Sequence, residues 1–160
     1  MTHTIREATD GDAGSVVRLL DAAMLAFDRE RTRQRVADGD VLVAVVRGHN
    51  REERRASGGA DATTGGDRIV GACVLTGSDA GPTEIEQIAV HRSRRGRGIG
   101  TTLVEAAATR TDGPLVARFR EGVRPFYESL CFDVEAADGG GDGADGSDDP
   151  AAGRLRGVLR

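Results

Sequence analysis

Lysine and tryptophan are absent from the 160-residue sequence, and aromatic residues make up only 3% of it. The two cysteines, Cys73 and Cys131, are too few for a disulfide framework or a metal cage. No apolar run approaches the ~20 residues that cross a bilayer. The first residues contain no apolar segment of the signal-peptide type. We therefore expect a cytoplasmic protein that holds no metal and is not embedded in a membrane.

The charge composition is unusual because every cation is an arginine. The formal net charge is −4, from 26 acidic and 22 basic residues. Compact aspartates combined with arginines are typical of a halophilic protein, in which salt screens exposed ion pairs. A GC-rich coding bias gives the same composition, and the sequence does not separate the two readings. The overall acidity argues against nucleic acid as the main partner, since phosphate binding needs a basic face.

Hydrophobic periodicity predicts a mixed α/β fold. The expected strands cover residues 4–8, 41–46, 67–76, 83–90, 115–119, 132–135 and 154–159, and the expected helices cover 12–25, 28–38, 98–110 and 124–130. The length corresponds to a single domain spanning residues 1–160. The order of elements is β-α-α-β-β-β-α-β-α-β-β.

Two stretches contain almost no large apolar side chains. Residues 47–67 are rich in Gly, Arg, Ala and Thr, and residues 138–149 are nearly all Gly and Asp. Such segments cannot bury enough surface to order themselves. Because both fall where strands turn back, we interpret them as flexible hairpin insertions.

A basic, glycine-rich turn joins the strand at 83–90 to the helix that follows it. Gly96, Gly98 and Gly100 allow a ligand to approach the backbone with no Cβ in the way. The first amides of a helix have no intrahelical acceptor, and the helix dipole adds positive potential there. Four arginines within residues 92–97 add further positive charge. This pattern predicts a site for phosphate or pyrophosphate.

Two familiar phosphate-binding patterns do not fit this turn. The dinucleotide pattern G-x-G-x-x-G would require glycine where Thr101 stands, and a Walker A loop would require lysine. The run Arg95-Gly96-Arg97-Gly98-Ile99-Gly100 does fit R/Q-x-x-G-x-G/A. With Ile88-Ala89-Val90-His91 before it, the run resembles the acetyl-CoA motif of the GCN5-related N-acetyltransferase (GNAT) family.

A second motif of that family follows downstream. Residues 124–132, Arg-Pro-Phe-Tyr-Glu-Ser-Leu-Cys-Phe, resemble its "FYESLGF" segment. The resemblance extends over residues 4–135. It implies the acyl-CoA N-acyltransferase fold, with a mostly antiparallel sheet flanked by helices. It also implies an N-acetyltransferase that uses acetyl-CoA as donor and a primary amine as acceptor, by direct attack without an acyl-enzyme.

The resemblance also assigns roles to individual residues. The backbone amides from Arg95 to Thr101 would cradle the pyrophosphate of coenzyme A. The strand edge would bind the pantetheine arm like an added strand, and an amide of Ile88 or Val90 would stabilise the oxyanion. This strand and the strand at 115–119 would splay apart to admit the arm. The cofactor-binding residues so implied are Ile88, Ala89, Val90, Arg95, Gly96, Arg97, Gly98, Ile99, Gly100 and Thr101.

Three side chains are candidates for proton transfer. Tyr127, the only tyrosine, matches the residue that protonates the departing thiolate, although a packing role at a helix start is the alternative. An alkylamine with a pKa near ~10.4 must lose a proton before attack. Glu84 and Glu86 share one face of their strand, so either could act as the base. Glu84 occupies the position of the glutamate base in the histone-acetylating members, and Glu86 is nearer the acetyl end by sequence. We favour Glu86.

The sequence departs from the family pattern at three positions. Arg120 and Leu115 stand where members that acetylate protein N-termini often have Asn and Glu, which argues against ribosomal-protein acetylation. Cys131 replaces the glycine of "LGF". A left-handed conformation would be strained at a cysteine, so we expect this turn to be built differently and the Cys131 thiol to be buried as a small hydrophobe.

Two other functions remain open at this point. The chain could be a catalytically silent acyl-CoA-binding module, or the arginine turn could bind nucleic acid or a protein. The sequence does not identify the amine acceptor. A homodimer could form if the C-terminal strand paired across two copies.

Overall fold

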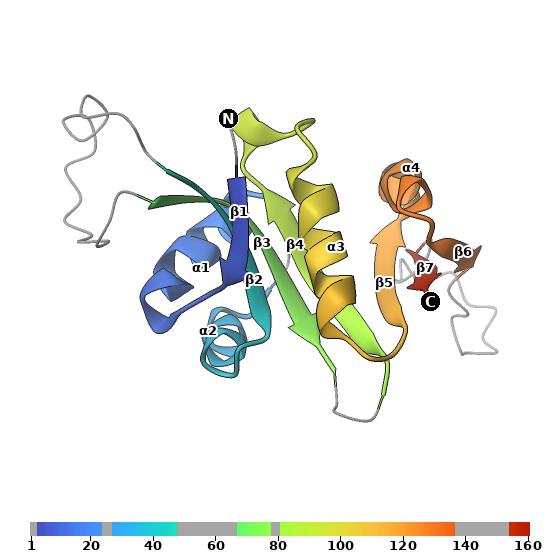
Figure 1. Cartoon of the computed structure of the whole chain (residues 1–160), viewed down its shortest axis with the longest axis horizontal. Coiled ribbons are helices and arrows are strands. Elements are labelled where there is room, and N and C mark those ends of the chain that lie inside the picture. The colour runs from blue at the N-terminus through green and yellow to red at the C-terminus, as the bar shows by residue number, and fades with distance from the viewer. Residues whose placement is uncertain (1–2, 24–26, 48–66, 78–80, 137–153) are drawn as a thin grey trace, which may run out of the picture. The chain divides into compact units, whose positions relative to one another are not determined.

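The computed structural model describes residues 3–23, 27–47, 67–77, 81–136 and 154–160. Seven strands are hydrogen-bonded in the order β1-β2-β3-β4-β5-β7-β6 (Figure 1). The strands are β1 His3–Glu7, β2 Val41–Arg47, β3 Asp67–Thr76, β4 Thr83–Val90, β5 Leu115–Arg120, β6 Asp133–Ala136 and β7 Arg154–Leu159. The helices are α1 Ala13–Ala22, α2 Arg29–Ala37, α3 Ile99–Arg110 and α4 Arg124–Ser129, with short 3-10 turns at Asp10–Asp12, Arg92–Arg94 and Glu121–Val123.

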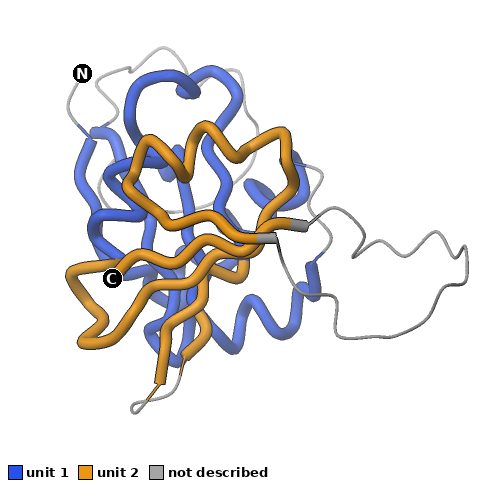
Figure 2. The backbone as a smooth tube through the Cα atoms, turned by 90° about the vertical axis from the view of Figure 1, so that its right-hand side faces the viewer, with its two compact units in different colours: residues 1–75, 87–107 blue, residues 76–86, 108–160 orange. Residues whose placement is uncertain are grey.

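The chain divides into two compact units (Figure 2). Unit 1 contains residues 1–75 and 87–107, and unit 2 contains residues 76–86 and 108–160. Strand β4 begins in unit 2 and ends in unit 1, so the chain crosses from one unit to the other between Glu86 and Gln87.

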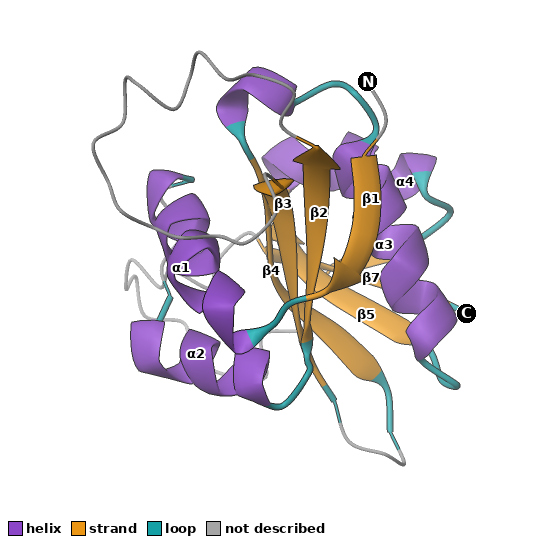
Figure 3. Cartoon of the chain, turned by 60° about the vertical axis from the view of Figure 1, so that its left-hand side comes forward, coloured by secondary structure: helices purple, strands orange, loops and turns teal. Residues whose placement is uncertain are grey.

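Unit 1 is built on β2, a strand of β-branched and small residues that is buried on both faces. Antiparallel pairing joins β2 to β1 and to β3. Helices α1 and α2 cover one face of these strands and α3 covers the other (Figure 3). The core on the α1 side gathers the apolar faces of α1 and α2 against alternate residues of β2, β3 and β4: Val16, Leu19, Leu20, Val36, Val41, Val43, Val45, Ala72, Val74 and Ala89.

A glycine in β3 determines how closely α3 approaches the sheet. A Cβ at Gly71 would lie 3.0 Å from Cγ2 of Ile99 and 3.1 Å from Cδ1 of Leu103. Both side chains are fully buried on the inner face of α3. Gly71 therefore lets the first turn of α3 lie directly on the strand.

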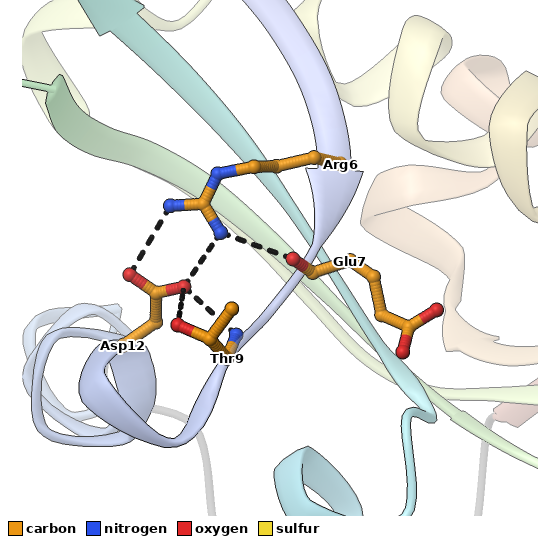
Figure 4. A network of polar contacts seen from close by, with 4 residues as sticks. All are labelled: Arg6, Glu7, Thr9 and Asp12. Carbon is orange, nitrogen blue, oxygen red and sulfur yellow. Dashed lines mark hydrogen bonds and ion pairs between the residues drawn. The ribbon is translucent and has the colours of Figure 1, made fainter.

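The entry to α1 is fixed by a buried carboxylate (Figure 4). Nη1 of Arg6 donates to Oδ2 of Asp12 at 2.6 Å, and the amide and hydroxyl of Thr9 donate to the same oxygen at 2.9 and 3.0 Å. The hydrogen bond from Arg6 lowers the pKa of Asp12. The network ties β1 to the turn that precedes α1.

Unit 2 contains the start of β4, followed by β5, β7 and β6. Its α4 packs through aromatic rings: Tyr127 stacks on Phe119 of β5 with ring centroids 4.2 Å apart, and Phe132 meets the edge of Tyr127 at 5.2 Å. A Cβ at Gly157 of β7 would lie 3.0 Å from both Phe119 and Phe132. Glycine at this position therefore leaves room for the rings.

The predicted fold class and the order of elements are confirmed. The structure is mixed α/β, with β4–β5 parallel and the pairs β1–β2, β2–β3, β5–β7 and β6–β7 antiparallel. The boundaries predicted for β3, β4 and β7 match the structure. The proposed insertions at 47–67 and 138–149 lie almost wholly outside the described residues. Strand β7 is paired on both edges within the chain, so it has no free edge for the dimer expected from it.

Both expectations for Cys131 were wrong. The residue is exposed, and it adopts the left-handed conformation (φ 64°) that glycine would take. Its amide donates to the Glu128 carbonyl at 3.1 Å, and the Phe132 amide donates to the Tyr127 carbonyl at 3.2 Å. These two bonds form the Schellman ending of α4, so the family's turn is kept and the strain is tolerated.

Replacing this cysteine should therefore stabilise the protein. We expect Cys131→Gly to raise the free energy of unfolding by about 1 kcal/mol, because glycine adopts positive φ without a Cβ clash. The melting temperature should rise by about 2–4 °C. Cys131→Ala, which removes the thiol but keeps the strain, is the matched control and should change stability by less than about 0.5 kcal/mol. Equal stabilisation by both variants in calorimetry would contradict the strain argument.

Candidate functional site

The turn between β4 and α3 has an unusual backbone. His91 caps the 3-10 turn Arg92–Arg94, with its Nδ1 2.8 Å from the Ser93 hydroxyl oxygen. Gly96 and Gly98 follow with φ of 74° and 77°, in the left-handed region. A Cβ at either glycine would meet no atom within 4 Å. The glycines are therefore required for backbone conformation, and the space beside them is open.

Helix α3 begins directly after this turn, inside unit 1. Its first intrahelical bond runs from the Thr102 amide to the Gly98 carbonyl at 3.0 Å, and the Thr102 hydroxyl donates to the same carbonyl at 2.9 Å. The amides of Ile99, Gly100 and Thr101 consequently precede the helical ladder and have no acceptor within it. Exposed glycine backbone, free helix amides and the helix dipole together suit an anion.

The arginines of the turn are placed differently from one another. Arg95 and Arg97 are exposed. Nε of Arg95 donates to the Val90 carbonyl at 3.2 Å, which holds this side chain against the end of β4. Arg97 lies between the two positive-φ glycines. Of the residues predicted to bind the cofactor, Arg95 to Thr101 are thus contiguous on one open turn and helix start.

Strand β4 carries the other predicted binding residues. Its pairing with β5 is parallel and joins Thr83–Ile85 to Leu115–Ala117. The strand continues to Val90, and the amide of His91 donates to the Val70 carbonyl of β3 at 2.7 Å. Ala89 is buried, whereas Ile88 and Val90 are half-buried. The part of β4 that was predicted to bind the pantetheine arm therefore lies beyond its pairing with β5.

Tyr127 is buried in unit 2, in the first turns of α4. Its ring contacts Phe119, Phe126 and Phe132, with centroids 4.2 to 5.2 Å away. Pro125 lies in the first turn of the helix, where it needs no acceptor for an amide. The ring of Tyr127 therefore packs among three phenylalanine rings, which is compatible with both the packing role and the catalytic role predicted for it.

The two candidate glutamates differ in their surroundings. Glu84 forms an ion pair with Arg118 of β5, at 3.4 Å between Oε1 and Nη1. Glu86, two residues further along the same face of β4, is half-buried, and its Oε2 is fully enclosed. The structure therefore places Glu84 in a charged pair and Glu86 in a more enclosed position.

Sequence reasoning missed Arg118 as a partner of the site. Only the parallel register of β4 with β5 brings Arg118 beside Glu84, and the sequence alone does not give that register. It also missed His3, whose Nε2 lies 3.1 Å from the Thr102 hydroxyl and ties the first strand to the first turns of α3.

Neither cysteine lies among the predicted site residues. Burial raises the pKa of Cys73 to about 12, so that thiol stays protonated near neutral pH.

One family model matches part of the sequence. The model of the GNAT acetyltransferase domain matches residues 60–133, which include both motifs. No curated protein matches the sequence at a significant level. In the described part of the chain, the helices are too short or too polar to span a membrane.

Solved structures of low sequence identity share the fold over nearly the whole chain. A GNAT-family acetyltransferase from Bacillus cereus is 12% identical with a TM-score of 0.70, covering 100% of this chain and 98% of that one. Arabidopsis thaliana NAA60, solved with a bisubstrate analogue, is 13% identical with a TM-score of 0.69, covering 99% and 97%. Diaminobutyrate acetyltransferase EctA from Paenibacillus lautus, solved with L-2,4-diaminobutyric acid and coenzyme A, is 15% identical with a TM-score of 0.61, covering 98% and 93%.

Proposed function

Because the chain carries a GNAT acetyltransferase domain and has the GNAT fold, we propose that it is an N-acetyltransferase that moves the acetyl group of acetyl-CoA to a primary amine. The observation that carries the proposal is the β4–α3 turn, where two glycines at positive φ, each with open space beside its Cα, lead into the first amides of α3. The similar structures solved with coenzyme A or a bisubstrate analogue support it. We take residues 1–160 as one N-acetyltransferase domain.

The residues of the turn fit a pyrophosphate. The amides from Arg95 to Thr101 donate to its oxygens. A Cβ at Gly96 or Gly98 would meet nothing within 4 Å, which supports the approach of a ligand to the backbone there. The backbone of Ile88, Ala89 and Val90 binds the pantetheine arm as an added strand. The register of β4 with β5 ends at Ile85. This supports the role, because the rest of β4 lies outside that pairing. An amide of Ile88 or Val90 stabilises the oxyanion.

The acetyl group moves in one direct step. The amine nitrogen forms a bond to the acetyl carbon, the carbon–sulfur bond breaks, and the thiolate leaves with the electron pair. Glu86 accepts the proton of the amine, and the Tyr127 hydroxyl gives a proton to the thiolate. A covalent route through Cys73 is disfavoured, because that thiol is fully buried and stays protonated.

The silent acyl-CoA-binding module remains the alternative. In that case acetyl-CoA binds at the same turn, and Tyr127 and Glu86 serve packing alone. The ring contacts of Tyr127 are compatible with both functions. Gly98→Ala tests the binding turn, and Tyr127→Phe tests the transfer step.

We expect Gly98→Ala to weaken acetyl-CoA binding by at least about tenfold. A Cβ there meets nothing in the protein but enters the space of the ligand and strains a residue at φ 77°. Gly39→Ala is the matched control, because Gly39 also has positive φ (81°) and lies in unit 1 but outside this turn. Calorimetry should show that the control loses stability while binding acetyl-CoA like the wild type. Unchanged binding in Gly98→Ala would contradict the proposed cradle.

Tyr127→Phe should lower kcat by about 10²–10⁴-fold, the usual contribution of a general acid. The phenylalanine ring keeps the contacts with Phe119 and Phe132, so stability and acetyl-CoA affinity should change little. Steady-state release of coenzyme A with an amine panel measures the effect. Wild-type turnover that Tyr127→Phe does not alter would remove this hydroxyl from the mechanism, and acetyl-CoA binding with no turnover on any amine would favour the silent module.

Glu86→Gln should lower kcat/KM more than Glu84→Gln does. Without a base, the reaction depends on amine that is already deprotonated, and this fraction rises about tenfold per pH unit below the amine pKa of ~10.4. The deficit of Glu86→Gln should therefore shrink as the pH is raised from 7 to 9.5. A larger and similarly pH-dependent deficit in Glu84→Gln would assign the base to Glu84 instead.

A further inference from the structure

Four arginines occupy facing positions on two neighbouring strands of unit 2. The antiparallel register pairs Arg118 of β5 with Arg156 of β7, and Arg120 with Arg154. Residues two apart on a strand share a face, and residues directly opposite across a ladder share it too. Phe119, which lies between Arg118 and Arg120, faces the other side and stacks on Tyr127. The arginine positions thus lie on the face of the sheet opposite to α4.

This arrangement is unfavourable for stability alone. Like charges directly opposite one another destabilise a strand pair, and β5 and β7 place two such pairs in succession. On its other edge, β7 sets Arg156 opposite Glu135 of β6. The chain as a whole is acidic, with a net charge of −4. Arg120 is exposed and Arg156 half-exposed, and neither makes a hydrogen bond or ion pair in the described part of the chain. The exposed Arg120, with Arg156 on the neighbouring strand, suits an anionic ligand.

Carboxylates flank the same face on the β4 side. Glu84 is paired in register with Val116, two residues before Arg118, and it holds the Arg118 guanidinium at 3.4 Å. Glu86 shares the face of Glu84. Neighbouring strands lie about 4.8 Å apart, so about 10 Å separates β4 from β7. Within that span the face changes from acidic to basic.

We propose that this face selects the acceptor, and that the acceptor is a primary amine that also carries a carboxylate. The inference rests on the proposed acetyltransferase function and specifies its substrate class. The guanidiniums of Arg156 and Arg120 bind the carboxylate, for which arginine offers paired donors in a planar fork. The amine lies toward Glu84 and Glu86. Arg118 is a positioning residue, because it acts on the site through Glu84.

The test compares acceptors that differ only in the carboxylate. L-lysine is paired with cadaverine, and L-ornithine with putrescine. L-lysine methyl ester keeps the shape but removes the negative charge. A peptide amide, Asp-Glu-Ala-Ala, is paired with Ala-Ala-Ala-Ala to distinguish an acidic peptide from a free amino acid as the source of the carboxylate. Release of coenzyme A is measured for each acceptor with the 160-residue chain.

We expect the carboxylate-bearing member of at least one pair to have a kcat/KM at least about tenfold higher, through a lower KM. Arg156→Gln should raise that KM by about tenfold or more and leave both kcat and the rate with the carboxylate-free amine within about twofold. Arg120→Gln should act in the same direction, and Arg156→Lys should recover part of the loss, because it keeps the charge. Arg110→Gln is the matched control, since Arg110 is an exposed arginine of unit 2 at the end of α3.

The outcomes distinguish a failure of this inference from a failure of the proposed acetyltransferase function. Equal or faster turnover of the carboxylate-free amines, or a preference that Arg156→Gln does not change, would overturn the inference and leave the acetyltransferase intact. No turnover of any amine would overturn the proposed function itself. Tight binding of single-stranded RNA or DNA that Arg156→Gln abolishes would assign the face to nucleic acid and likewise overturn the inference.

Discussion

The close approach of α3 to β3 at Gly71 is the contact on which the proposed binding turn depends. Ile99 and Leu103 would be pushed away by a Cβ at that position, so the first turn of the helix is held at a fixed distance from the strand. The chain must then leave β4 at Val90 and enter the helix at Ile99 within a few residues. Two left-handed glycines achieve this reversal. The space beside both glycines is open, so the residues that allow the packing of α3 also leave the backbone of the turn accessible.

In unit 2 the alternation of side chains along β5 separates two kinds of surface. Leu115 and Ala117 share a face with Phe119, which stacks on Tyr127 of α4, whereas Val116, Arg118 and Arg120 face the other way. A shift of one residue in the register with β7 would exchange these two sets. Gly157, opposite Ala117, makes room for Phe119 and Phe132 and so disfavours such a shift. The packing that positions Tyr127 therefore also positions the arginines.

The sequence predicted what depends on local chemistry. Patterns among neighbouring residues located the helices and strands, and glycine spacing located the binding turn, because both signals come from neighbours in the chain. It missed the ion pair of Glu84 with Arg118 and the facing arginines of β5 and β7, since both depend on pairing between distant segments. The prediction for the turn at Cys131 was wrong for another reason. Local strain argued against a left-handed conformation, but the two backbone hydrogen bonds that end α4 outweigh that strain.

The absence of lysine is consistent with the chemistry proposed here. A guanidinium keeps its proton at any pH at which a protein works, whereas an amine can lose its proton and become a nucleophile. A chain whose cations are all arginine can hold anions, through the turn at 95–97 or the face at Arg120 and Arg156, and it offers no side-chain amine that could compete for its own thioester. Composition alone does not distinguish this advantage from salt adaptation or codon bias. The arginines at facing positions of β5 and β7 point to anion binding, because like charges directly opposite one another lower the stability of a strand pair.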